Sequence, residues 1–301
     1  MSWRSVMITQ PTKLSIKNRQ LRITQDEEWS VPMEDINSII LETPQVNISA
    51  KVMSCIADNR IVLYSCDEKH LPNGIFIPFN CHSRQLKTLK QQLDCTESFN
   101  KRCWQKIIKQ KIRNQAEVLK MINKTIMGDY LDALSEKVNS GDTDNKEAIA
   151  AKGYFTTLFG KTFSRNDDES IYNIALNYGY AIIRGAISRS IVSYGYMPSI
   201  GIHHKSELNN FNLADDFIEP FRPVIDLWVK NNINEETLFE KEIRGELINL
   251  LNVDVKIQGK LQSVSNAINI MISSYTTAIN QKNYTKLEVP EILPIQIHSY
   301  E

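Results

Sequence analysis

The apolar residues of this 301-residue chain change their spacing near residue 80, and this change constrains the fold more than any other feature. Before it, apolar side chains recur at every second position, as in KLSIKNRQLRI (13–23), which is typical of strands with one buried face. From Trp104 onward they recur every three or four positions, as on an amphipathic helix. The sequence therefore predicts an α+β fold whose β-rich part comes first.

Residues 1–80 predict a small β-sandwich-like domain with one helix. Within 13–23, Asn18 and Arg19 can turn the chain between two alternating runs, which indicates a hairpin. The segment SAKVMSCIAD predicts the single helix. Further short apolar runs predict strands at Ile36–Leu41, Val46–Ile48, Ile61–Tyr64 and Ile75–Phe79.

Residues 81–285 predict a larger, all-helical domain. Turn-rich breaks at 141–145, 159–168 and 194–201 separate its helices. Besides the helix that contains Trp104, the spacing predicts helices at Asn145–Phe159, Glu169–Tyr194, Asn212–Lys230, Glu235–Leu251 and Gln262–Asn280.

Residues 286–301 contain Pro290 and Pro294 and cannot form a continuous helix. They predict an extended tail. Such a tail either packs on its own body or adds a strand to the sheet of another protein.

Composition excludes several classes of protein. The 35 basic and 35 acidic residues cancel, so a nucleic-acid surface would have to be a local basic patch. The five cysteines form no CxxC pair and are typical of reduced thiols. The chain shows neither a signal-peptide h-region nor a membrane-spanning apolar run, so we expect a cytoplasmic protein without membrane contact.

Three segments beside the turn-rich breaks carry side chains suited to catalysis. The first contains Glu147, in the first turn of a predicted helix. Asp144 and Glu147 also match a D-x-x-E capping box, and a first-turn glutamate suits the helix dipole, so this segment alone favours capping.

The second segment contains the adjacent histidines His203 and His204. Neighbouring residues on an extended chain point to opposite faces, so at most one of them is expected to enter a given site. A surface or hydrogen-bonded role is the commoner one for a histidine.

The third segment is LADDFIEPFRPVID (213–226), which places carboxylates three and four residues apart around Glu219. Pro220 and Pro223 are expected to kink or end the helix directly after Glu219. Alternatively, the acidic cluster marks a helix amino terminus capped by Asn212. Together, however, two carboxylates and one imidazole without a thiolate suit manganese or magnesium better than zinc.

At this point the residues resemble a known family, the CRISPR-associated integrase that is protein one of the universal CRISPR adaptation pair. The resemblance rests on EAIAAKGYF at 147–155, NYGY at 177–180, GIHH at 201–204 and NLADDFIEPFRP at 212–223. The opening SWRSV, the segment LPNGIFIPFNCHSRQ and the TLFG at 157–160 resemble the type II branch.

The resemblance implies that Glu147, His204 and Glu219 are the catalytic residues and hold Mg²⁺ or Mn²⁺. It implies that Asp216 does not bind the metal itself but supports the residues that do. Tyr154 would orient the DNA or the metal surroundings, or else fill the core.

The resemblance also implies contacts with DNA phosphates. Lys152, where arginine is more usual, and Lys205 and Arg222 are the candidates near the site. Between Lys101 and Lys124 there are eight basic residues and one acidic residue, which favours a simple solvated helix face.

The activity implied is attack by the 3′-hydroxyl of a short double-stranded DNA fragment on a phosphodiester at the edge of a CRISPR repeat. The implied assembly is a homodimer, in which residues 1–80 form the dimer contact and contact partners. A dimer of the second adaptation protein would bridge two such integrase dimers. A type II effector nuclease and an accessory adaptation protein are further candidate partners. An inert scaffold and a metal-dependent nuclease of branched DNA remain as alternatives.

Overall fold

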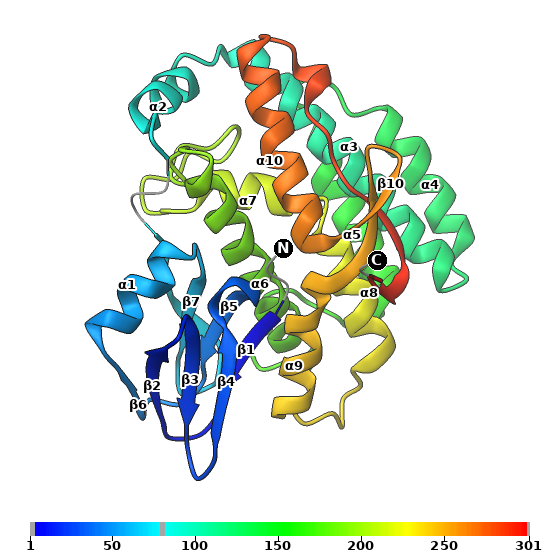
Figure 1. The fold of residues 1–301 in the computed structure, drawn as a ribbon. Coiled ribbons are helices and arrows are strands. Elements are labelled where there is room, and N and C mark those ends of the chain that lie inside the picture. The colour runs from blue at the N-terminus through cyan, green and yellow to red at the C-terminus, as the bar shows by residue number, and fades with distance from the viewer. Residues whose placement is uncertain (1–3, 79–81, 300–301) are drawn as a thin grey trace.

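The computed structural model describes residues 4–78 and 82–299, and it has a β-rich half and a helical half (Figure 1). The predicted β-sandwich-like arrangement with one helix, α1 (Ala50–Asp58), is confirmed. Leu14, Leu21, Ile39 and Ile56 belong to one buried cluster shared by two sheets and α1. The sheets have the orders β1(Arg4–Ile8)-β5(Ile36–Leu41)-β7(Val62–Cys66)-β8(Pro72–Phe76) and β4(Glu28–Pro32)-β3(Gln20–Thr24)-β2(Thr12–Lys17)-β6(Val46–Ile48).

The predicted hairpin is the β2–β3 pair, whose antiparallel register places Leu14 opposite Ile23. Asn18 and Arg19 both have positive φ, 51° and 59°, as a two-residue hairpin turn requires. Phe79 and Cys81, like the first residues of the SWRSV motif, lie outside the described residues.

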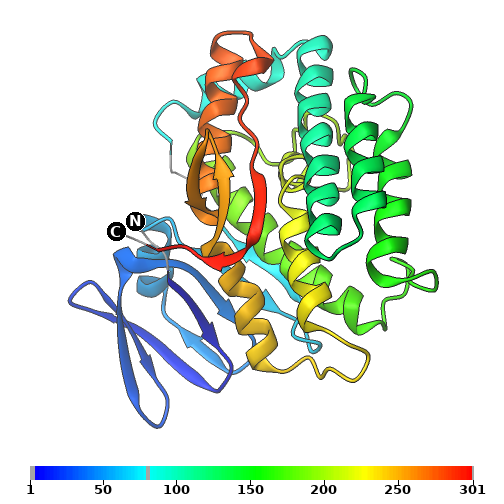
Figure 2. The ribbon, with the colours of Figure 1, turned by 90° about the vertical axis from the view of Figure 1, so that its right-hand side faces the viewer.

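The helical half is built around two long helices, α3 and α6 (Figures 1 and 2). Helices α2 and α4 were not predicted from the spacing, and α9 is shorter than predicted. The helices are α2(Gln85–Leu93), α3(Glu97–Met121), α4(Thr125–Glu136), α5(Lys146–Phe159), α6(Ile171–Ser193), α7(Asn212–Ile218), α8(Arg222–Asn232), α9(Lys241–Asn249) and α10(Val264–Asn280), with short 3-10 turns at Met33–Asp35, Leu250–Asn252 and Tyr284–Lys286.

The prediction that residues 81–285 are all helical is wrong, because a three-stranded sheet of order β10-β9-β11 lies in this half. The strand β9 (Val253–Ile257) buries every second side chain, and Gln258 and Gly259, both with positive φ, turn the chain into β10 (Lys260–Ser263). Ser263 then caps α10 by accepting the amide of Asn266.

The tail packs on its own body. Its strand β11 (Glu291–Ile297) pairs antiparallel with β9, so that Ile292 lies opposite Val255. In Figure 2 the red tail runs beside the orange strands of this sheet. No helix within residues 4–78 and 82–299 is long and apolar enough to cross a membrane.

The two halves meet where the β1-β5-β7-β8 sheet packs on α6. Tyr64 of β7 donates its hydroxyl to the carbonyl of Ile182 at 2.8 Å, and Gly185 leaves room for the tyrosine ring. Nearby, Glu42 accepts from Arg244 at 2.8 Å and from Tyr178 at 3.0 Å in the buried interior. These contacts fix α6, and with it the helices that carry the candidate residues.

Candidate active site

The centre of the site is Lys111, which sequence reasoning did not single out. It lies on α3 with only 9% of its side chain exposed, and its Nζ is 2.5 Å from Glu147 Oε1 and also pairs with Glu219 Oε2. Burial alone would lower the pKa of Lys111, but the two carboxylates outweigh burial and raise it. A charged lysine therefore joins two of the three predicted ligands.

Glu147 reaches Lys111 from the first turn of α5. The amides of Lys146 and Glu147 are accepted by the Asp142 carboxylate at 2.9 and 3.0 Å. The capping-box interpretation is therefore wrong, because Asp142 rather than Asp144 caps the helix. The Glu147 carboxylate is left free to face Lys111.

Glu219 lies at the break between α7 and α8, where Pro220 and Pro223 end one helix and begin the next, as predicted. Its Oε1 accepts from Arg222 Nε at 2.9 Å. Its buried Oε2 forms an ion pair with the Lys111 ammonium without the geometry of a well-formed hydrogen bond. Burial would raise the pKa of Glu219, but Arg222 and Lys111 lower it to about 2.

His204 is held by Asp216, a fully buried carboxylate on α7. Asp216 accepts the backbone amides of Ile202, His203 and His204 at 2.5 to 3.1 Å, and it lies 2.7 Å from His204 Nδ1. Asn212 does not cap the helix, because its side chain instead donates to the carbonyls of Ser199 and Ser206. Both α7 side chains therefore fix the loop that carries the histidine.

The expectation that the two histidines point to opposite faces is wrong, because their rings lie edge to face with centroids 5.6 Å apart and both contact Trp104. His203 stacks flat on Trp104 at 4.2 Å, and burial lowers its pKa. The Asp216 hydrogen bond raises the pKa of His204 against the opposing effect of burial. That bond places the proton of a neutral ring on Nδ1, so the lone pair of Nε2 is available to a ligand.

Gly201 allows the loop to close over Asp216. A Cβ at this position would lie 2.3 Å from the His204 carbonyl oxygen and 2.8 Å from Asp216 Oδ2. Replacement Gly201→Ala is therefore expected to lower the free energy of unfolding by ~1–3 kcal/mol, measured by denaturant titration.

The matched control is Gly245→Ala in α9, where the nearest atom to a Cβ is Met7 Cε at 4.0 Å. Because alanine favours a helix over glycine, this variant is expected to be stabilised by up to about 1 kcal/mol. Equal effects of the two substitutions would contradict the close packing of the loop.

The remaining predicted residues lie around this centre. Tyr154 is fully buried in α5, so it cannot contact DNA directly, and burial beside Asp226 raises its pKa. Lys152 and Lys205 are exposed. Arg222 is half-buried and already paired with Glu219.

The donor set fits a divalent ion, although in residues 4–78 and 82–299 no three His, Cys, Asp or Glu side chains gather closely enough to hold one. Lys111 occupies the space between Glu147 and Glu219. Glu219 offers an oxygen without a hydrogen bond, and His204 offers an oriented Nε2. Two carboxylates and an imidazole are ligands that Mn²⁺ and Mg²⁺ accept.

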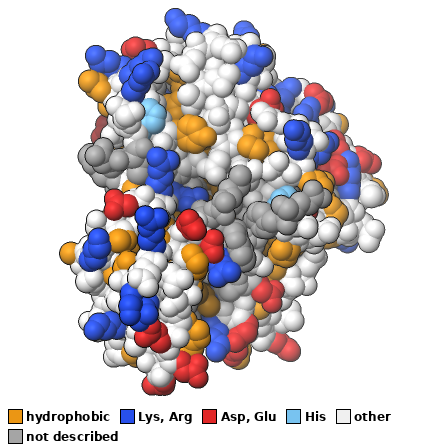
Figure 3. Space-filling view, in the orientation of Figure 1, with side chains coloured by type: hydrophobic (Ala, Val, Ile, Leu, Met, Phe, Trp, Pro, Cys, Tyr) orange, Lys and Arg blue, Asp and Glu red, His pale blue; other side chains and the backbone are white. Residues whose placement is uncertain are grey.

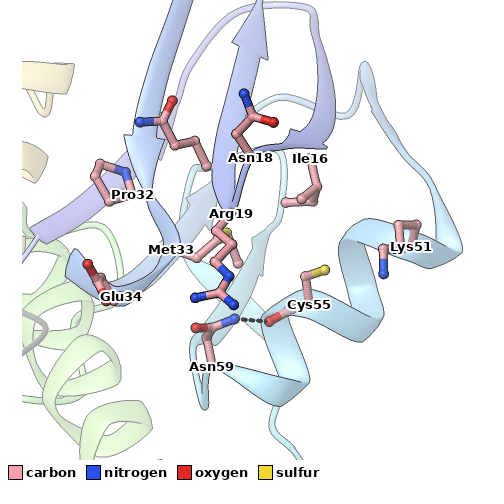
Figure 4. A pocket seen from close by; sticks show the side chains of 10 residues that line it. Ile16, Asn18, Arg19, Pro32, Met33, Glu34, Lys51, Cys55 and Asn59 are labelled. Carbon is pink, nitrogen blue, oxygen red and sulfur yellow. Dashed lines mark hydrogen bonds between the residues drawn. The ribbon is translucent and has the colours of Figure 1, made fainter.

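A separate cavity of about 720 Å³ lies in the β-rich half, between the β2–β3 turn and α1 (Figure 4). Arg19, Glu34, Lys51 and Cys55 are among the residues that line it, and Asn59 donates to the Cys55 carbonyl at 2.8 Å. None of its described lining residues belongs to the candidate site.

Comparison with known proteins identifies the family of the chain. Residues 6–252 match the family model described as CRISPR associated protein Cas1. The chain is 43% identical, over all of both chains, to the CRISPR-associated endonuclease Cas1 of Neisseria meningitidis.

Two solved structures share the fold. A casposase bound to integration product has a TM-score of 0.77 at 20% identity, covering 100% of this chain and 97% of that chain. A chain of a Cas6-RT-Cas1–Cas2 complex has a TM-score of 0.72 at 17% identity, covering 97% of this chain and 36% of that chain.

Proposed function

Because the chain belongs to the Cas1 family of CRISPR-associated proteins, we propose that it is a metal-dependent integrase that inserts short DNA fragments into a CRISPR array. The observation that carries this proposal is the meeting of Glu147 and Glu219, from separate segments of the chain, at one buried cation. The oriented ring of His204 completes the donor set. The names of the relative and of the casposase support a reaction on DNA.

Glu147, His204 and Glu219 would hold Mg²⁺ or Mn²⁺. Such an ion, when bound, polarises a phosphoryl oxygen and lowers the pKa of an attacking hydroxyl. Asp216 fixes the tautomer of His204, and Arg222 holds one oxygen of Glu219 so that the other faces the site.

The proposed reaction is a transesterification. The 3′-hydroxyl of the fragment forms a bond to a phosphorus at the repeat edge, and the bond from that phosphorus to the 3′-oxygen of the repeat strand breaks. The hydroxyl proton passes to solvent, and the departing oxygen takes one up. Attack by water at the same site gives hydrolysis, and the name endonuclease borne by the 43% identical relative favours this as a second activity.

We assign three kinds of partner to the protein. Its substrates are double-stranded fragments and CRISPR repeat DNA, and it assembles as a homodimer through residues 1–80. The second adaptation protein would bridge two such dimers, which the Cas1–Cas2 assembly named for a structure of the same fold supports.

The direct test is a plasmid-joining assay with a labelled duplex fragment, run with and without the second adaptation protein. Joined product that forms in Mn²⁺ or Mg²⁺ and disappears with chelator is the expected result. Cleavage without joining under every condition would support the nuclease alternative. Absence of both cleaved and joined product would support the inert scaffold.

Joining is also expected to weaken as the pH falls through the pKa of His204, which the Asp216 hydrogen bond raises above 6.5. Metal ligation needs the neutral ring. At subsaturating Mn²⁺ the joining rate is therefore expected to fall with decreasing pH, and the pH at which half of the rate is lost is expected to lie above about 6.5. Initial joining rates measured from about pH 5 to 8.5 test this, with subsaturating Mn²⁺ at each pH.

In chelator, the raised pKa of His204 has the opposite pH dependence for stability, because it stabilises the folded protein at the low pH at which joining is weak. A raised pKa of His204 contributes stability that is fully present below about pH 6.5, the unfolded value, and is lost as the pH rises through the folded value. His204→Asn is expected to remove both dependences, while His203→Ala keeps them. Joining that stays flat down to about pH 5 would count against ligation by His204.

A further inference from the structure

A second cavity, of about 330 Å³, lies between β8 and helices α6, α7 and α8. Three arginines line it, Arg165, Arg184 and Arg222, together with a single carboxylate, Asp215. On the face shown in Figure 3, by contrast, basic and acidic side chains are interspersed over the β-rich half. The cavity is therefore a local concentration of positive charge in a chain whose net charge is zero.

The guanidinium of Arg165 is held by neutral partners. It donates to the side-chain oxygen of Asn173 and, at 2.8 Å, to that of Asn177, and it lies 5.6 Å from the ring centroid of Tyr180. Within residues 4–78 and 82–299, no carboxylate forms an ion pair with it. Its charge is positioned in advance, and amide oxygens do not neutralise it.

The guanidinium of Arg184 is similarly supported. It lies 5.3 Å from the ring centroid of Phe211, while its nearest ion-pair contact, Asp215, is 3.9 Å away. Its side chain is 40% exposed, so an incoming anion can reach it. A contact of 3.9 Å is a weak competitor for a charged ligand.

Arg222 connects this cavity to the candidate active site. It stacks at 4.5 Å on the ring of Tyr180, on which Arg165 also lies, and its Nε binds Glu219. The guanidinium carries five donors, and the Nε contact uses one of them. A group bound in the cavity would lie one side chain away from Glu219.

We propose that this cavity, named here the arginine pocket (Arg165, Arg184 and Arg222), binds a backbone phosphate of the DNA substrate next to the reacting phosphodiester. Planar guanidiniums held by rings and amides bind phosphate oxygens in pairs and lose little entropy in doing so. This inference rests on the proposed function, because the arginine pocket would hold the DNA strand that reacts at the site of Glu219. Arg165 and Arg184 are binding residues in this assignment, and they touch no reacting atom.

The test measures affinity for a fluorescent duplex in chelator over a range of salt concentrations, using Arg165→Gln, Arg184→Gln and the double variant. Each single change is expected to weaken binding on the order of tenfold, and the salt slope should fall by about 0.9 for each phosphate that the variant no longer neutralises. Arg184→Lys should keep the slope and lose part of the affinity.

Arg22→Gln is the matched control, since it removes one positive charge from β3, where Arg22 pairs with Glu28 at 2.6 Å. It is expected to leave affinity and slope unchanged. Thermal melting checks that the variants fold, and Arg184→Gln alone decides the matter if removal of the Arg165 hydrogen bonds unfolds the chain.

Three results overturn the proposal. In the first, the wild type binds the duplex and Arg184→Gln matches it in affinity and slope. In the second, Arg22→Gln loses as much as Arg184→Gln. In the third, the wild type itself has no affinity for DNA, which overturns the proposed function as well, so the two failures are distinguishable.

Discussion

Joining of a labelled fragment to a repeat-bearing plasmid is expected to fall at least about a hundredfold in each of Glu147→Ala, His204→Ala and Glu219→Ala. A Lewis-acid metal is worth several kcal/mol of transition-state stabilisation, and about 1.4 kcal/mol corresponds to a factor of ten in rate. Single-turnover joining at saturating partner protein and Mn²⁺ measures the loss. Full joining by any one variant would remove that residue from the catalytic set.

The control for the imidazole is His203→Ala, since His203 stacks on Trp104 and is not hydrogen-bonded through its ring to Asp216. It is expected to join nearly as well as the wild type. A loss equal to that of His204→Ala would mean that the neighbouring histidine is the ligand.

Loss of Glu219 also has a structural cost that must be separated from catalysis. Its removal leaves Lys111 and Arg222 buried without their shared partner, which destabilises by roughly 3–5 kcal/mol. Assays at a temperature well below the melting point of the variant, with circular dichroism as the check, keep the two effects apart. Glu219→Gln, which keeps the size of the side chain, is the better-folded companion.

The β-rich half could be predicted from sequence because its signals are local. Asn18 and Arg19 sit between two alternating runs, and the register of β2 and β3 follows from that turn. The sheet of β9, β10 and β11 could not be predicted in the same way. The partner of Val255 across β9 and β11 is Ile292, thirty-seven positions away, and a five-residue strand between helices shows too few alternations to be distinguished from a helix end.

The candidate site followed a different course. Glu147 and Asp216 each matched a helix-end role when considered alone, and only the order of several motifs indicated a common site. The structure explains the ambiguity: Asp142 takes the capping role at α5, and Asp216 uses its carboxylate on the loop amides of 202–204. Neither arrangement can be recognised from the usual capping spacing, because Asp142 lies four and five residues before the amides that it accepts, and the amides bound by Asp216 lie 12 to 14 residues before it.

Lys111 was missed because it was counted among the basic residues of 101–124, for which a solvated face was favoured. Its position contained a usable signal. Lys111 follows Ile108 by three residues and precedes Ile112 by one, so it lies within the apolar stripe of α3, where those isoleucines are fully buried. A lysine on the buried face of a helix needs a buried anion. Two anions, the buried Glu219 and the half-buried Glu147, pair with it.

Lys111→Met is expected to destabilise the metal-free protein strongly. Without the ammonium, Glu147 and Glu219 face each other with no cation between them. In chelator this change is expected to lower the free energy of unfolding by roughly 3–5 kcal/mol, and the melting temperature by on the order of 10 °C. Thermal melting in chelator measures it.

The matched control for this change is Lys109→Met on the same helix. The Lys109 side chain is 27% exposed, and its ion pair with Glu136 is long, at 3.8 Å. Its effect on the free energy of unfolding is expected to stay below about 1 kcal/mol.

Addition of Mn²⁺ is the second half of the test. In the wild type the metal must compete with the Lys111 ammonium for the same oxygens, whereas in Lys111→Met it does not. The gain in melting temperature on adding Mn²⁺ is therefore expected to be larger in Lys111→Met than in the wild type, with a lower dissociation constant by calorimetry. A variant that melts like Lys109→Met in chelator, or that gains no more from Mn²⁺ than the wild type, would show that Lys111 and the metal do not share these carboxylates.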